Sequence, residues 1–149
     1  GQLLNTDTLV ETSVIYYTKE SYPAMFFKNG SFSYVWPKWG NKDTTSATND
    51  SLHRVDMTFE AGNTTKPRGY NKKDFYSNYY LGDMSENREK VPHYGNLLYT
   101  DVWDYIDIEC GNDAYGFKYF INVKPNGDTS DIQFLFSGQD TLLIDGSGN

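Results

Sequence analysis

Apolar and polar residues alternate in short runs along most of the chain, which is the pattern of half-buried β-strands. The alternation is clearest at 53–59, 105–110, 116–123 and 132–136. From 106 to 110, apolar side chains occupy the even-numbered positions and acidic side chains the odd-numbered ones. Alanine is scarce and no segment shows a clear helical period, so we expect strands and not a helical bundle.

Turn signals separate these runs. Asn29-Gly30 lies between two apolar runs, which is the strongest short signal for a hairpin. We expect Pro37 to end the second arm of this hairpin, because Pro cannot donate to a strand ladder. Pro125-Asn126-Gly127-Asp128 predicts another turn, in which Pro presets φ and Gly127 accepts a positive φ.

The remaining segments complete an all-β pattern. The spacing of about ten short strands, 8–14 residues apart, predicts an antiparallel β-sandwich. We expect residues 1–149 to form a single domain that is a piece of a larger multidomain protein. The less regular segments are interpreted as strands at 13–18, 75–81, 96–102 and 141–144, loops at 40–51 and 61–73, and a single helical turn at 83–90.

Composition narrows the classes of partner. The chain has a formal net charge of −7, and its only step of adjacent basic residues is Lys72-Lys73. Nucleic-acid binding needs a basic surface, so we expect no nucleic-acid partner and no anionic membrane partner. No apolar run is long enough to cross a bilayer, so we expect no membrane insertion.

The sequence carries none of the common catalytic motifs. A Gly-x-Ser-x-Gly elbow, a His-Glu-x-x-His zinc motif and a phosphate-binding Gly loop are all absent. The single cysteine, Cys110, is interpreted as a small buried apolar residue. His53 and His93 are interpreted as structural histidines. We therefore predict a protein that is not an enzyme and that needs no cofactor.

Four carboxylates lie within nine residues: Asp101, Asp104, Asp107 and Glu109. Carboxylate oxygens are the ligands of Ca²⁺, so one hypothesis is a Ca²⁺ site. A solvated polar face with local turns is the alternative, because the spacing is not that of an EF-hand loop. A pair of glycosidase carboxylates is a third interpretation, and it requires a separation across a cleft that spacing alone cannot give.

The three tryptophans are candidates for a sugar-stacking surface. Trp36 and Trp39 bracket Pro37 before a polar loop, and Trp103 lies in the tyrosine-rich half of the chain. Aromatic faces with polar rims suit carbohydrate ligands. The alternative is that these rings belong to the core and to ordinary sheet surface, because neighbouring strand residues point to opposite faces.

An ordered series of short motifs runs through the second half. The motifs are Tyr79-Tyr80-Leu81-Gly82, Val91-Pro92-His93-Tyr94, Tyr99 to Asp107, Phe117-Lys118-Tyr119, Pro125 to Asp128, Asp131-Ile132 and Phe136-Ser137-Gly138. The series resembles the uncharacterised N-terminal domain of large secreted bacterial proteins that carry SBBP-type β-propeller repeats. Many of those proteins also have PKD or immunoglobulin-like modules and a C-terminal sorting domain for type IX secretion. The resemblance implies an extracellular or cell-surface location and no established catalytic residue.

An aspartate followed by Thr or Ser, and then by an apolar residue or Thr, occurs four times, a pattern similar to the O-glycosylation acceptor of bacteria with type IX secretion. Two of these acceptors, Thr44 and Ser51, fall in the predicted long loop and are the favoured glycosylation sites.

Three functions remain open from the sequence. The leading one is a non-catalytic structural or adhesion module of a secreted, cell-surface protein, whose partners are neighbouring modules of the same chain and a glycan or surface protein. The second is a carbohydrate-binding module. The third is a subunit of an extracellular filament or matrix, since an open sheet edge can accept a neighbouring strand.

Overall fold

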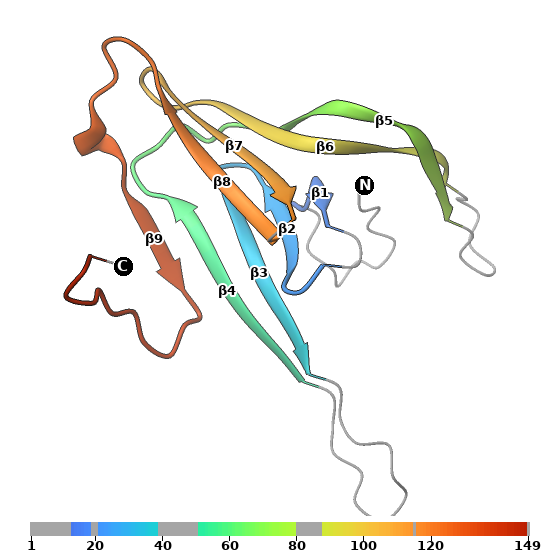
Figure 1. The fold of residues 1–149 in the computed structure, drawn as a ribbon, viewed down its shortest axis with the longest axis horizontal. Helices are drawn as coiled ribbons and strands as arrows, with labels where there is room; N and C mark the ends of the chain where they lie inside the picture. The colour runs from blue at the N-terminus through green and yellow to red at the C-terminus, as the bar shows by residue number, and fades with distance from the viewer. Residues whose placement is uncertain (1–12, 19–20, 39–50, 80–87, 115, 149) are drawn as a thin grey trace, which may run out of the picture.

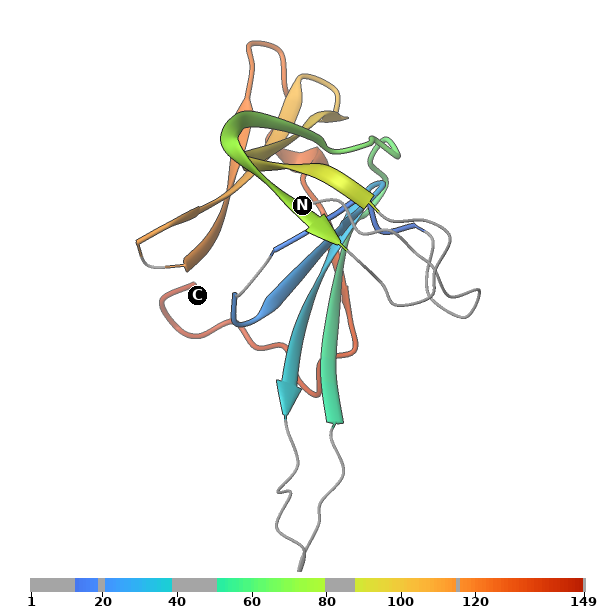
Figure 2. The same cartoon turned by 90° about the vertical axis from the view of Figure 1, so that its right-hand side faces the viewer.

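The protein was analysed as a computed structural model, which describes residues 13–18, 21–38, 51–79, 88–114 and 116–148. These residues form two antiparallel sheets, which confirms the all-β sandwich (Figures 1 and 2). The five-stranded sheet has the order β1-β2-β3-β4-β9 and the four-stranded sheet has the order β5-β6-β7-β8. The strands are β1 (Tyr16–Tyr17), β2 (Ala24–Lys28), β3 (Ser31–Lys38), β4 (Ser51–Phe59), β5 (Arg68–Tyr79), β6 (Arg88–Trp103), β7 (Ile106–Asp113), β8 (Gly116–Val123) and β9 (Phe134–Ser137).

The core lies between the two sheets and is built from alternate residues of the strands. The predicted inward faces are confirmed: Met57 and Phe59 on β4 and Ile106, Ile108 and Cys110 on β7 are all buried. Both sheets contribute large side chains, and ring contacts at 5.0–6.1 Å connect them. The buried set is completed by Met25, Phe27, Phe32, Leu97, Tyr99, Val102 and Trp103.

The β2–β3 hairpin forms where Asn29-Gly30 predicts it. Lys28 pairs with Ser31, and Gly30 has a φ of +62°, which suits glycine. The expectation that Pro37 ends the second arm was wrong, because β3 continues through Pro37 to Lys38. Pairing with β2 stops at Val35, so this end of β3 pairs with β4 alone. A strand with one partner tolerates the missing N–H of proline.

The β5–β6 hairpin is longer than the alternation indicates. β5 begins at Arg68, inside the segment predicted to be a loop, and β6 begins at Arg88, inside the predicted helical turn. The predicted strand at 141–144 is also wrong, because these residues lie outside any strand and Leu142, Leu143 and Ile144 are 63–81% exposed. A segment becomes a strand only where a partner pairs with it, and residues 68–72 have a partner in β6.

The connection from β8 to β9 contains the predicted turn and a short 3₁₀ helix, η1 (Thr129–Asp131). The positive φ of the turn falls on Asn126, at 76°, and not on Gly127. Asp128 caps η1 by accepting from the Ser130 backbone N–H at 2.9 Å. No helix within the described ranges is long and apolar enough to cross a membrane.

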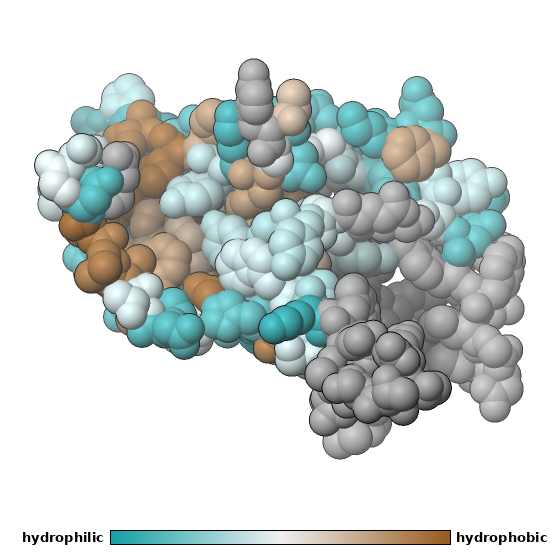
Figure 3. All heavy atoms as spheres, turned by 60° about the horizontal axis from the view of Figure 1, so that its bottom comes forward, coloured by the Kyte–Doolittle hydropathy of each residue, from teal (hydrophilic) through white to brown (hydrophobic). Residues whose placement is uncertain are grey.

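One group of exposed apolar side chains lies on the side of the molecule that carries β9. In Figure 3 the brown spheres concentrate at the left, the side on which Figure 1 shows β9 and the C-terminal segment. Leu135 of β9 is 54% exposed, and the three residues Leu142 to Ile144 are more exposed still. This side of the sandwich therefore presents apolar surface to its surroundings.

Candidate functional site

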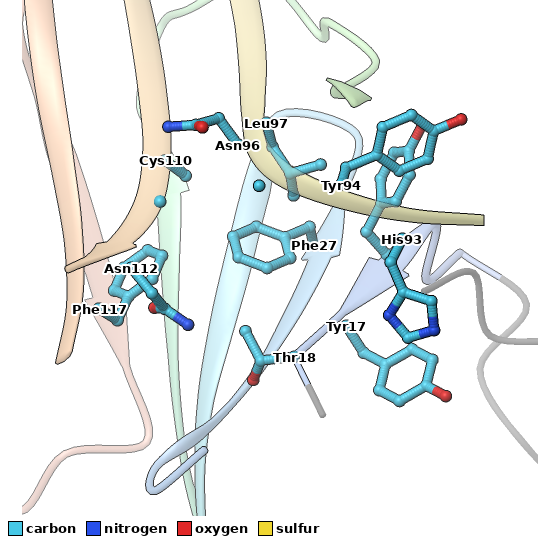
Figure 4. Close-up of a pocket in the computed structure, with 13 residues that line it drawn as sticks. Tyr17, Thr18, Phe27, His93, Tyr94, Asn96, Leu97, Cys110, Asn112 and Phe117 are labelled. Atoms are coloured by element: carbon cyan, nitrogen blue, oxygen red, sulfur yellow. The ribbon is translucent and has the colours of Figure 1, made fainter. Parts of the chain in front are cut away.

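The two sheets enclose a cleft of ≈ 200 Å³ near β1 (Figure 4). Strands of both sheets line it, so the sandwich itself shapes the hollow. The lining residues are Tyr16, Tyr17, Thr18, Phe27, His93, Tyr94, Gly95, Asn96, Leu97, Cys110, Gly111, Asn112 and Phe117. None of these is Asp, Glu, Lys or Arg, although these four residue types make up 22% of the chain.

Tyrosines from both sheets form one wall of the cleft. The rings of Tyr16 on β1 and Tyr94 on β6 meet edge to face, with centroids 5.9 Å apart and planes at 88°. The Tyr16 hydroxyl accepts a hydrogen bond from the Gly69 backbone N–H at 3.2 Å. A Cβ at Gly69 would lie 2.5 Å from Cγ of Tyr94, so only glycine permits this wall. The close approach of β5 thus positions the Tyr94 ring.

The polar groups of the cleft differ in what they can offer a ligand. Asn96 points away from the hollow in Figure 4. Its side-chain amide accepts a hydrogen bond from Asn71 at 2.8 Å and donates one to Glu109 at 3.1 Å. Thr18 Oγ1 accepts from the Met25 backbone N–H at 2.9 Å. Asn112 is exposed at the end of β7, beside Phe117. Aromatic walls with a few hydroxyl and amide groups suit a small neutral ligand.

A serine and a histidine meet at the edge of the cleft. Ser77 Oγ lies 2.7 Å from Nε2 of His93, and the imidazole also packs against the Phe75 ring with centroids 4.7 Å apart. This is the separation that a nucleophile and its base require, and it equally serves to fix the ring of His93. Sequence reasoning missed the pair, because the two residues lie 16 positions apart and only the irregular β5–β6 register brings them together.

The predicted tryptophan surface is divided by the structure. Trp36 is half-buried on β3. Its ring is nearly parallel to that of Tyr34, with ring centroids 5.8 Å apart, and its centroid also lies 5.8 Å from that of the His53 ring. Tyr34 in turn lies 6.0 Å from Phe117 of the cleft. A row of rings therefore runs from the cleft along β3.

Trp103 does not belong to this row of rings. Trp103 is 4% exposed, and its indole Nε1 donates to the Glu60 carbonyl at 3.0 Å. Its ring is thus part of the core, as the alternative interpretation had it, and offers no face to a sugar. Trp39 lies outside the described residues.

Of the four predicted Ca²⁺ ligands, the structure brings together two, Asp101 and Asp107. Asp101 and Asp107 accept from Lys124 Nζ at 3.0 and 2.7 Å, so a protein cation already lies between them. Glu109 accepts instead from the Tyr70 hydroxyl and from Asn96, and Asp104 is exposed. The described ranges hold no group of three or more His, Cys, Asp or Glu that could bind a metal ion. The hydrogen bonds to Asp107 and Asp101 raise the pKa of Lys124 above its usual value.

The remaining predicted residues are placed as follows. Ser51 is exposed at the first position of β4, which leaves its hydroxyl accessible. Thr44 lies outside the described residues. Cys110 is 1% exposed, and burial raises the pKa of its thiol, which keeps it protonated and unreactive at neutral pH.

Comparison with known proteins gives one match. No curated protein and no solved structure matches the chain. A family model does match, and it spans residues 1–149, which is the whole chain. With two sheets, a neutral cleft and this match over its full length, the chain belongs to the family described as a domain of unknown function (DUF7948).

Proposed function

We propose that this chain is a non-catalytic adhesion module of a secreted, cell-surface protein. The observation that carries the proposal is the cleft, in which aromatic rings from both sheets surround a hollow that, among the described residues, is lined by no carboxylate and no lysine or arginine. Such a lining favours binding through ring contacts and hydrogen bonds. Asp101, Asp107 and Glu109 are held in structural contacts, and the thiol of Cys110 is buried. The secreted location rests on the motif series.

The Ser77–His93 pair provides the direct test of the non-catalytic assignment. The assay is hydrolysis of p-nitrophenyl acetate by the whole chain and by Ser77→Ala, followed at 400 nm or thereabouts. We expect both proteins to match the buffer rate. Turnover by the unaltered chain that disappears in Ser77→Ala would identify a serine nucleophile and overturn the assignment.

A carbohydrate-binding module is the second candidate, and the ring row along β3 favours it. Tyr34, Trp36 and His53 continue from Phe117, so a sugar seated in the cleft would meet further aromatic surface beside it. The cleft volume is below the ~300–1,000 Å³ of drug-sized pockets, which favours a single sugar ring inside it.

A neutral glycan array tests this candidate. Retention on a glycan should weaken in Trp36→Ala and in Tyr94→Ala, while Leu52→Ala, an exposed residue on the neighbouring strand, should retain it. Binding that is absent, or equal in all four proteins, would remove carbohydrate recognition by this site.

A further inference from the structure

The β5–β6 hairpin carries a surface that differs in charge from the rest of the chain. It runs along the top of Figure 1 and reaches to the right beyond the other described strands. Residues 68–79 and 88–97 contain five basic and two acidic residues, a formal charge of +3 on a chain whose net charge is −7. The remainder of the chain is correspondingly more acidic, so the hairpin is a positive end on a negative molecule.

A surface hollow of ≈ 540 Å³ lies on this hairpin. Two strands contribute to it, because Lys72 pairs with Tyr94 and Tyr76 with Pro92 in the β5–β6 ladder. We call these lining residues the hairpin patch: Lys72, Lys73, Asp74, Phe75, Tyr76, Lys90 and Pro92. The sequence shows only the Lys72-Lys73 step, and the pairing adds Lys90 from the opposite strand.

The three ammonium groups of the hairpin patch have no ion pair among the described residues, whereas other cations do. Arg54, Lys118 and Lys124 each lie within 3.0 Å of a carboxylate oxygen. Lys72, Lys73 and Lys90 are exposed, and within the described part of the chain Asp74 is the only carboxylate that lines their hollow. Uncompensated positive charge on an acidic protein attracts and retains an anionic partner.

Two aromatic rings stand among these lysines. Phe75 is 60% exposed and Tyr76 is 55% exposed, which is high for side chains of this size. Phe75 is held from one side by its contact with the His93 ring, so its orientation is set before any ligand arrives. Exposed rings beside cations offer an apolar face and a charge within one short surface.

We propose that the hairpin patch binds an acidic polysaccharide. Lysine ammonium groups would pair with carboxylate or sulfate groups of the polymer, and the Phe75 and Tyr76 rings would pack on the apolar faces of its sugar rings. A nucleic acid is disfavoured because its binding needs an extended basic surface, whereas the hairpin patch is a short surface with three lysines beside Asp74. This proposal is independent of the neutral cleft and would hold if the cleft bound nothing.

The experiment measures fluorescence anisotropy of two labelled probes, a tetragalacturonate and a sulfated heparin tetrasaccharide, with the whole chain. We expect at least one of these probes to bind at about 0.05 M NaCl and to lose affinity about tenfold at about 0.5 M, because salt screens exposed charge pairs. Lys72→Gln/Lys73→Gln should weaken binding about tenfold, and Phe75→Leu about threefold.

The matched control is Lys38→Gln/Lys66→Gln, which removes the same charge from exposed lysines outside the patch and should change affinity less than about twofold. Urea unfolding of each variant checks that it is folded. Failure of both acidic probes to bind would overturn the proposal, and so would an equal loss in the control. Tighter binding of single-stranded oligo-dT or of phosphatidylglycerol vesicles than of either glycan would likewise assign the patch to another partner.

Discussion

The Tyr99 hydroxyl joins the two sheets at a buried point, and its removal tests how the sandwich is held together. Tyr99 lies on β6 with 0% exposure. Its hydroxyl donates to the carbonyl oxygens of Lys28 and Ser31, both at 3.0 Å, which flank the β2–β3 turn in the other sheet. The substitution Tyr99→Phe keeps the edge-to-face contact with Phe59, at 5.0 Å and 89°, and removes only the donor.

The expected cost follows from these two acceptors. A net intramolecular hydrogen bond contributes about 0.5–1.5 kcal/mol, and a buried polar group left without a partner costs about 1–3 kcal/mol. Because the two carbonyls share one hydrogen, we expect Tyr99→Phe to lower the free energy of unfolding by about 2 kcal/mol. With a urea m-value of about 2 kcal/mol/M, the unfolding midpoint should fall by about 1 M.

Equilibrium urea unfolding, followed by tryptophan fluorescence at neutral pH, measures this shift. Tyr105→Phe is the matched control, because Tyr105 is 51% exposed and its change should stay within about 0.5 kcal/mol. A Tyr99→Phe midpoint equal to that of the control, with the same m-value, would refute the reasoning that this hydroxyl stabilises the contact between the sheets.

Four further predictions concern the packing of Cys110, backbone conformation, the pH dependence of stability and the titration of Tyr70. Cys110 should not react with a thiol reagent such as DTNB in the native protein and should react fully in denaturant; rapid native reaction would contradict its burial. Gly138 has a φ of +88°, and a Cβ there would lie 2.3 Å from the Arg54 carbonyl oxygen, so Gly138→Ala should cost more than about 2 kcal/mol. Gly116 has a φ of +119°, and a Cβ there would meet no atom within 4 Å among the described residues other than its chain neighbours, so Gly116→Ala should lower the free energy of unfolding by about 1 kcal/mol. Equal losses in Gly138→Ala and Gly116→Ala would show that the clash at Gly138 is relieved. Burial raises the pKa values of Tyr34, Tyr99 and Tyr119 above the usual 10.0. Above that pH the phenols ionise in the unfolded chain but stay protonated in the folded one. The free energy of unfolding should therefore be constant below pH 10.0 and should fall as the pH rises past it. Urea midpoints that stay constant from pH about 9 to pH about 11 would contradict this sign. Tyr70 should titrate at about 12, because burial and then its hydrogen bond to Glu109 raise its pKa, and ultraviolet difference absorbance at 295 nm or so would detect it.

The alternation of side chains was enough to predict the strands that make the core. The faces of β4, β7 and β8 follow the sequence pattern, since one face of each strand must be apolar to be buried. The Asn29-Gly30 turn was equally readable, because a two-residue loop with glycine has few other solutions. All these features depend on residues that are neighbours along the chain.

The candidate site depends on which strands pair and in what register. Positive φ values at Asn71 and Lys90 interrupt the regular alternation of the β5–β6 hairpin, so its side-chain directions cannot be read from the sequence pattern. The Ser77–His93 contact and the hairpin patch both arise from this irregular pairing. Trp103 is a further example of what the sequence pattern leaves open. Its residue type suggested a ligand platform, and only the packing between the sheets placed it in the core.

The chain's own pattern of residues thus determined its all-β class and its core faces, through the period of two that every half-buried strand obeys. Tertiary structure decided the cleft, the row of rings and the pairing of Lys124 with two aspartates, because each joins residues from strands far apart in sequence. The physical reason is that burial favours apolar residues within each strand separately, whereas a binding surface requires a particular distance between strands.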